Sequence, residues 1–150
     1  MFTREIRTEI EIEGTAQQVW DTLTDVESYS QWNSGFVKAA GRAKVGETLR
    51  ITFSQKPGKT MDMHPTVLVA DPGRELRWLR RLLMPAIFDG EHRFEIHETE
   101  PGQVTFVQAE RFSGVLVPFL GGMIEGSTLS MLERVNADLA ARVRAGRTAA

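Results

Sequence analysis

The chain has 150 residues, the size of one domain, and its 41% hydrophobic and 25% charged residues are typical of globular proteins. A formal net charge of -2 gives no electrostatic basis for binding nucleic acid or an anionic surface, and the lack of cysteine excludes disulfides and thiol chemistry. The N-terminus carries no apolar signal region, and the apolar stretch Val115–Ile124 is too short to span a bilayer. We therefore expect a cytoplasmic protein without stable membrane insertion.

The first predicted elements are one strand and two short helices. Residues Phe2–Ile12 alternate between isoleucine and charged side chains, which predicts a strand with one buried face. Thr15 then fits a helix N-cap, because Gln18 stands at the spacing of a capping box. Asp25 fits the cap of a second short helix over Val26–Gln31.

The middle of the chain predicts a run of antiparallel strands joined by turns. Three Pro-Gly pairs mark turns, at Pro57-Gly58, Pro72-Gly73 and Pro101-Gly102. With the first strand there are seven candidates, the other six being Phe36–Arg42, Leu49–Ser54, Thr60–Ala70, Glu75–Arg80, Glu91–His97 and Val104–Phe112. Pro65 inside the fourth of these seven implies an edge position or a bulge.

A long amphipathic helix is predicted over Pro118–Arg144. Its second half repeats apolar residues at helical spacing: Leu132, Val135, Leu139 and Val143. Its first half, Phe119–Met131, contains three glycines, which indicate a kink or room for a guest molecule. We expect a frayed tail from about residue 146 and a single domain over residues 1–150. The predicted class is α+β, with a seven-stranded curved sheet wrapped around this helix.

This order of elements resembles the helix-grip fold of the START-like SRPBCC superfamily, and in particular its polyketide cyclase/dehydrase-like subgroup. The segments that carry the resemblance are Val19–Asp25, Tyr29–Asn33, Glu75–Trp78, Gly90–Phe94 and Glu110–Pro118. The resemblance implies an apolar cavity between the sheet and the C-terminal helix. It does not imply a substrate, because this fold hosts carriers, sensors, cyclases and chaperone activators alike.

Strand alternation predicts which side chains face that cavity. His92 shares its face with Phe94, and Glu110 shares its face with Gln108. A bulge at Gly90 would shift this register. The full set of predicted ligand contacts is Phe53, Trp78, Arg80, His92, Phe94, Phe106, Gln108, Glu110, Phe112, Phe119 and Met123. We expect a pocket of about 300 Å³ or more.

Three functions remain open from the sequence. The first is a protein that binds a small hydrophobic molecule without a cofactor, as a monomer or a homodimer. The second is a cyclase or dehydratase in which His92 and Glu110 act as general acid and base, although the same pair is also compatible with a structural hydrogen bond. The third is an interaction module that uses the basic residues between Arg74 and Arg81 beside the apolar segment Leu82–Ile87. The three histidines lack metal-ligand spacing, so no metal is expected.

Overall fold

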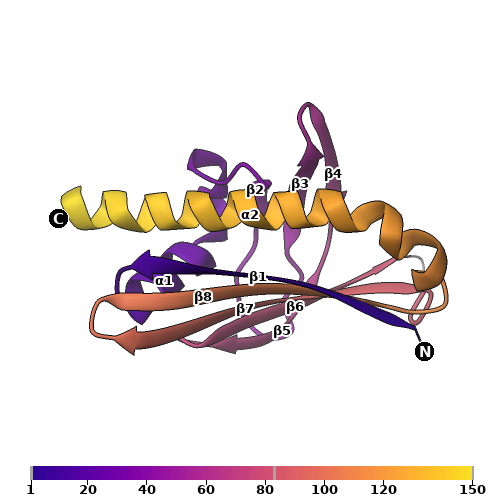
Figure 1. The fold of residues 1–150 in the computed structure, drawn as a ribbon, viewed down its shortest axis with the longest axis horizontal. Helices are drawn as coiled ribbons and strands as arrows, with labels where there is room; N and C mark the ends of the chain where they lie inside the picture. The colour runs from indigo at the N-terminus through magenta and orange to yellow at the C-terminus, as the bar shows by residue number, and fades with distance from the viewer. Residues whose placement is uncertain (1, 83, 150) are drawn as a thin grey trace.

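The computed structural model describes residues 2–82 and 84–149, and the side chains of residues 55, 82, 121–124 and 149 lie outside this description. In chain order the elements are β1 (Thr3–Glu13), α1 (Ala16–Thr24), the 3-10 helix η1 (Val26–Gln31), β2 (Phe36–Ala40), β3 (Arg50–Lys56), β4 (Lys59–Met63), β5 (Thr66–Asp71), β6 (Glu75–Leu82), β7 (Phe88–Glu100), β8 (Gln103–Ser113) and α2 (Val117–Ala149). Figure 1 shows α2 running along the length of the curved sheet. The predicted α+β helix-grip architecture is confirmed.

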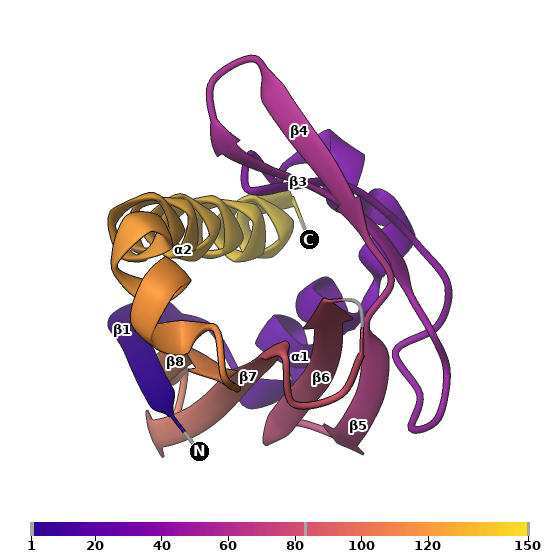
Figure 2. The same ribbon diagram turned by 90° about the vertical axis from the view of Figure 1, so that its right-hand side faces the viewer.

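The strands form two antiparallel sheets. The large sheet has the order β1-β8-β7-β6-β5, and the small sheet has the order β2-β3-β4. Viewed along α2, the large sheet lies below the helix and the strands of the small sheet rise beside it (Figure 2). The space between the two sheets and α2 is therefore bounded on three sides by different parts of the chain.

The predicted strand Thr60–Ala70 is two strands, so the described residues contain eight strands rather than seven. The break falls between β4 and β5, at Pro65. Proline has no N–H to continue a ladder, and here its carbonyl accepts a hydrogen bond from Leu49 N at 2.8 Å. The chain thus crosses from the small sheet to the large sheet at this residue.

The structure agrees with some of the predicted helix ends and differs from others. The capping box of α1 is confirmed, because Gln18 N donates to Thr15 Oγ1 at 3.1 Å and Thr15 N donates to Gln18 Oε1 at 2.9 Å. Asp25 stands at the N-cap of η1 as predicted, but its carboxylate makes no capping hydrogen bond to the backbone and instead accepts the hydroxyl of Ser28 at 2.7 Å. The predicted end of the long helix at Arg144 is too early, because α2 continues to Ala149.

The second half of α2 packs into the core as its spacing predicts. Leu132, Val135 and Leu139 are fully buried in the hydrophobic core. Gly35, just before β2, allows this close approach: a Cβ atom at that position would lie 2.5 Å from Val135 Cγ2. In Figure 1 the first turns of α2, drawn in orange, bend away from the axis of the rest of the helix. Neither this helix nor another in the described part of the chain is long and apolar enough to cross a membrane.

Candidate functional site

The candidate site begins with a row of side chains across the inner face of the large sheet. Trp78 on β6 pairs with His92 on β7, and His92 pairs with Glu110 on β8. The register is continuous through Gly90, which pairs with Arg80 and Phe112, so the bulge considered at Gly90 is absent. Because that register is regular, alternation brings His92 and Glu110 together on the buried face.

Glu110 lies between the side chains of His92 and Arg80. His92 Nδ1 is 2.7 Å from Glu110 Oε2, and Arg80 Nη2 is 3.4 Å from Glu110 Oε1. His92 is the only polar contact of Oε2 among the described residues. Burial by itself would raise the pKa of Glu110, but the attraction of His92 and then of Arg80 outweighs burial and holds this pKa below its ordinary value.

Gly90 makes room for this ion pair. A Cβ atom on Gly90 would lie 2.8 Å from Glu110 Oε1 and 3.3 Å from Arg80 Nε. The Arg80 guanidinium also lies 5.5 Å from the centre of the Phe53 ring, a cation–π distance. Arg80 therefore reaches from a partly exposed position, with 28% of its side chain accessible, down to the buried carboxylate.

A second set of hydrogen bonds fixes the other nitrogen of His92. Gln108 Nε2 donates to the backbone carbonyl of Leu132 at 3.0 Å and to Asn136 Oδ1 at 2.7 Å. A backbone carbonyl only accepts, so the amide group of Gln108 must point there and its oxygen must face His92 Nε2, 3.0 Å away. His92 Nε2 is therefore a hydrogen-bond donor.

This orientation has a consequence for acid–base chemistry. Because His92 Nε2 carries a proton, the close contact of Nδ1 with Glu110 Oε2 requires one further proton between those two atoms. Neither nitrogen of His92 is then free to accept a proton from a substrate. Of the two predicted catalytic groups, only Glu110 can still accept a hydrogen bond, because its carboxylate oxygens have more lone pairs than partners.

The cavity at this cluster is small. Its volume is about 10 Å³, room for roughly one water molecule. It is lined by Phe36, Phe53, Met63, Trp78, Arg80, His92, Glu110, Thr128 and Met131. The expected pocket of about 300 Å³ is therefore wrong for this conformation, since aromatic rings and the two methionines occupy the space between the sheets and α2.

The predicted contact residues separate into three groups. Five of them line the cavity: Phe53, Trp78, Arg80, His92 and Glu110. Four are buried without lining it: Phe94, Phe106, Gln108 and Phe112. Phe119 was predicted to contact the ligand, but it is 74% exposed on the first turns of α2. The side chain of Met123 lies outside the described residues.

Four lining residues were missed by sequence reasoning: Phe36, Met63, Thr128 and Met131. Met131 closes the glycine-bearing stretch in which we expected room, so its region was indicated although its role was not. Thr128 lies in the same stretch, where the apolar repeat is too weak to show which face of the helix is buried. Phe36 and Met63 belong to short strands at irregular registers.

The basic residues near β6 are mostly engaged within the molecule. Arg77 contacts Glu75 at 2.6 Å and Glu91 at 3.0 Å, and Arg81 lies 3.9 Å from Asp89. With Arg80 bound to Glu110, three of the four cations predicted as a partner surface have carboxylate partners. The following segment packs on the connection to α2, where Val115 N donates to Ala86 O at 3.1 Å.

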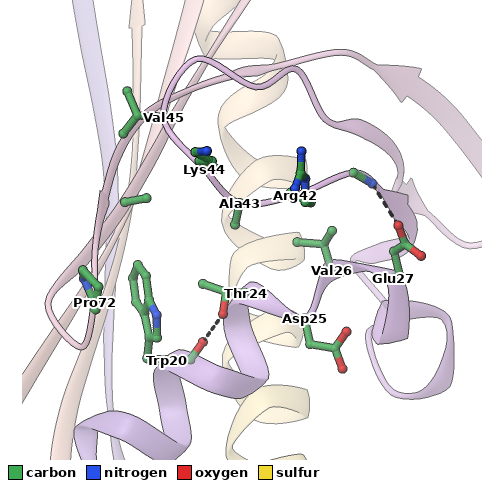
Figure 3. A pocket seen from close by; sticks show the side chains of 12 residues that line it. Trp20, Thr24, Asp25, Val26, Glu27, Arg42, Ala43, Lys44, Val45 and Pro72 are labelled. Carbon is green, nitrogen blue, oxygen red and sulfur yellow. Dashed lines mark hydrogen bonds between the residues drawn. The ribbon is translucent and has the colours of Figure 1, made fainter.

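A larger cavity, of about 670 Å³, lies outside the core (Figure 3). It is lined by Trp20, Thr24, Asp25, Val26, Glu27, Gly41, Arg42, Ala43, Lys44, Val45, Ala70 and Pro72. Figure 3 shows the Trp20 ring between Pro72 and Thr24, while two acidic and two basic side chains surround the rest. This outer cavity shares no residue with the interior cavity, and its two acidic and two basic side chains do not favour a ligand of either charge.

Among the described residues, no cluster of three His, Asp or Glu side chains could hold a metal ion.

The chain is similar to known proteins both in sequence and in fold. Residues 3–144 match the model of a family described as polyketide cyclase/dehydrase and lipid transport. A START superfamily protein from Mycobacterium smegmatis has a TM-score of 0.75 at 19% identity, over 93% of this chain and 97% of that chain. Norcoclaurine synthase from Thalictrum flavum, in complex with dopamine and hydroxybenzaldehyde, has a TM-score of 0.70 at 14% identity, over 97% and 88%. The Zhui aromatase/cyclase from Streptomyces sp. R1128 has a TM-score of 0.71 at 15% identity, over 97% and 98%. No curated protein gives a significant match.

Proposed function

The chain belongs to the polyketide cyclase/dehydrase and lipid transport family, and from this premise we propose that it binds a small hydrophobic molecule between the large sheet and α2. The observation that carries the proposal is the cluster of Arg80, His92 and Glu110 inside a lining that is otherwise largely aromatic and methionine. A solved structure with the same fold holds two small aromatic molecules, which supports a ligand of that size.

The buried cluster has no evident structural advantage. Taking charges out of water costs several kcal/mol per ion, and replacing a buried ion pair by apolar side chains is often neutral or stabilising. A few polar groups in an apolar lining are, however, what orients a ligand in a pocket. Orientation of a guest is therefore a better explanation of Glu110 and its partners than stability.

The ligand needs more room than the present 10 Å³, and the lining includes side chains that can provide it. Met63 and Met131 are unbranched and change rotamer readily, so they can move aside at low cost. Arg80 lies at the partly exposed edge of the cavity and can swing outward with its guanidinium in water. Burial of apolar ligand surface, at about 25 cal/mol per Å², offsets the cost of this rearrangement.

The test compares two methionine variants in a dye-binding assay. Met131→Trp fills the space that the ligand body needs, whereas Met61→Trp places the same ring at a position that is 62% exposed. A hydrophobic fluorescent dye should bind the natural protein and Met61→Trp, and fatty acyl or polycyclic compounds should displace it. Binding should be lost in Met131→Trp, whose folding is checked by circular dichroism. Equal binding by both variants would place the dye elsewhere and overturn the proposal.

A proton-transfer reaction is a second candidate, favoured by Glu110 Oε2, which lines the cavity in its charged form and can accept a further hydrogen bond. In it Glu110, rather than His92, removes a proton from carbon next to a carbonyl, and Arg80 stabilises the enolate oxygen. The probe is 2-tetralone in heavy water, with deuterium exchange followed by NMR. Exchange should be accelerated by the natural protein and by the exposed control Glu133→Gln, and lost in Glu110→Gln. Equal rates with all three proteins would exclude this reaction.

A further inference from the structure

We propose that the cavity is a preformed subsite for one hydroxyl group of the ligand, held by Glu110 and Thr128. The inference rests on the proposed binding function and specifies which chemical group enters first. Thr128 lies on α2 and Glu110 on β8, so the two residues approach the cavity from opposite sides. An alcohol or a phenol is then the ligand class that the site selects.

Both residues present a buried oxygen with hydrogen-bonding capacity to spare at the cavity. Thr128 is 2% exposed, and its Oγ1 has no hydrogen-bond partner in the described part of the protein. Among the described residues, Glu110 Oε2 is contacted by His92 Nδ1 alone, at 2.7 Å, and a carboxylate oxygen can accept a second hydrogen bond. Buried polar atoms are normally paired, and leaving one unpaired costs about 1–3 kcal/mol. The unpaired Thr128 Oγ1, together with the free acceptor capacity of Glu110 on the same cavity, therefore points to a guest that pairs with both.

The size of the cavity matches the group. Its volume of about 10 Å³ corresponds to roughly one water-sized oxygen and cannot accept a carboxylate or a methoxy group without further rearrangement. The apolar body of the ligand would lie beyond it, in the space that Met131 and Phe53 fill. The polar end is thus preformed, while the apolar end is adaptable.

The chemistry of the two oxygens also favours a hydroxyl group. A carboxylate oxygen only accepts hydrogen bonds, whereas a threonine hydroxyl both donates and accepts. A ligand hydroxyl can donate to Glu110 Oε2 and accept from Thr128 Oγ1 at once. An ether cannot donate, a carboxylate would be repelled by Glu110, and a cation would meet Arg80 close by.

The experiment uses four probes with one ring system and displacement of the same dye: 2-naphthol, naphthalene, 2-methoxynaphthalene and 2-naphthoic acid. We expect 2-naphthol to bind roughly ten- to a hundredfold more tightly than naphthalene, from hydrogen bonds to a charged and a neutral partner. The methyl ether and the acid should bind no better than naphthalene. Thr128→Val should reduce the preference for 2-naphthol several-fold, Thr128→Ser should retain it, and the exposed control Ser130→Val should leave it unchanged.

The outcomes separate this inference from the function on which it rests. If naphthalene and 2-naphthol displace the dye equally well, the hydroxyl subsite is wrong while ligand binding stands. If 2-naphthoic acid binds best, Arg80 rather than Glu110 selects the ligand, and the inference is also wrong. If none of the four probes displaces the dye, the proposed binding of small aromatic molecules fails too. The comparison of probes on the natural protein decides the matter even if Thr128→Val does not fold.

Discussion

Gly90 shows how one absent side chain sets the geometry of the buried charges. It stands opposite Arg80 in the sheet, and its missing Cβ leaves the space that Arg80 and Glu110 Oε1 occupy. Its backbone is not in the left-handed region, so the need for glycine here is steric and not conformational. The glycine thus contributes to the candidate site without touching a ligand.

Gly90→Ala should therefore destabilise the protein, by roughly 1–3 kcal/mol, because the added methyl group pushes on the Arg80–Glu110 pair. Gly126→Ala is the matched control on α2, where an added Cβ meets nothing within 4 Å. It should stabilise the protein by about 1 kcal/mol through helix propensity. Urea unfolding of the two variants measures both effects, and a Gly90→Ala protein as stable as the natural one would contradict this account.

The charge of Glu110 predicts a pH dependence. Its pKa in the folded protein lies below the ordinary value of 4.5, so its stabilising contribution is complete above that value and is lost as pH falls through the folded-state pKa. Glu110→Gln removes this contribution and should cost about 1–2 kcal/mol near pH 7. The difference from the natural protein should shrink as the pH falls below about 4.5 in urea unfolding experiments. A difference that stays constant down to acidic pH would contradict the charged state of Glu110.

Sequence alternation was enough to place His92 and Glu110 on the same inner face, and the register of β7 and β8 in the structure sets them opposite each other. It could not assign the donor role of His92 Nε2, which depends on the carbonyl of Leu132 in a distant helix. The position of Thr128 in the cavity lining could not be predicted for a related reason. A lone polar residue in a glycine-bearing helix carries no periodic signal of the face on which it lies.

Among the elements, α2 joins the two sheets by polar as well as apolar contacts. Arg134 donates from Nη1 to the carbonyl of Ser34 at 2.8 Å and from Nη2 to the carbonyl of Ser54 at 2.6 Å. Asp138 accepts both the amide and the hydroxyl of Ser34, at 2.8 and 2.6 Å. These contacts attach the small sheet to the helix beside the candidate site.

Arg134→Met should loosen that attachment, since it keeps the apolar stem but removes both hydrogen bonds. Hydrogen bonds from a charged donor are worth about 1.5–3 kcal/mol each when buried, and partial exposure reduces the expected loss to roughly 1–2 kcal/mol. Arg144→Met is the control, because that side chain is exposed and makes no hydrogen bond or ion pair with the described residues. Its unfolding free energy should change by less than about 0.5 kcal/mol. Equal stability of the two variants would show that Arg134 does not fasten the small sheet.

The sequence predicted the ends of strands correctly at the Pro-Gly turns. It did not predict the strand break at the place where the chain changes from one sheet to the other. The three Pro-Gly turns separate strands as predicted, with Gly58, Gly73 and Gly102 at positive φ. Pro65 marked an irregularity correctly, but local sequence does not say that the chain passes to a second sheet there. That outcome depends on which strand edge lies close enough to pair, a property of the tertiary fold.

At the scale of the molecule, the volume between the sheets and α2 was the least predictable quantity. The fold class leaves a space there, yet side chains such as Met63 and Met131 reduce it to about 10 Å³. Protein interiors usually pack to crystal-like density, so an open space is the exception that a ligand must create. The outer cavity of about 670 Å³ beside Trp20 is therefore the competing place for a hydrophobic probe.

Hydrogen exchange measured with and without 2-naphthol distinguishes the two places. A ligand in the interior contacts β3, β4 and α2 at once, through Phe53, Met63 and Met131, and should slow amide exchange in all three elements. A ligand in the outer cavity would instead protect η1 and residues 41–45, which line only that site. Met131→Trp should abolish the interior protection without affecting the outer cavity. Protection confined to η1 and residues 41–45 in the natural protein would move the binding site to the surface, because interior binding cannot leave β3, β4 and α2 unchanged.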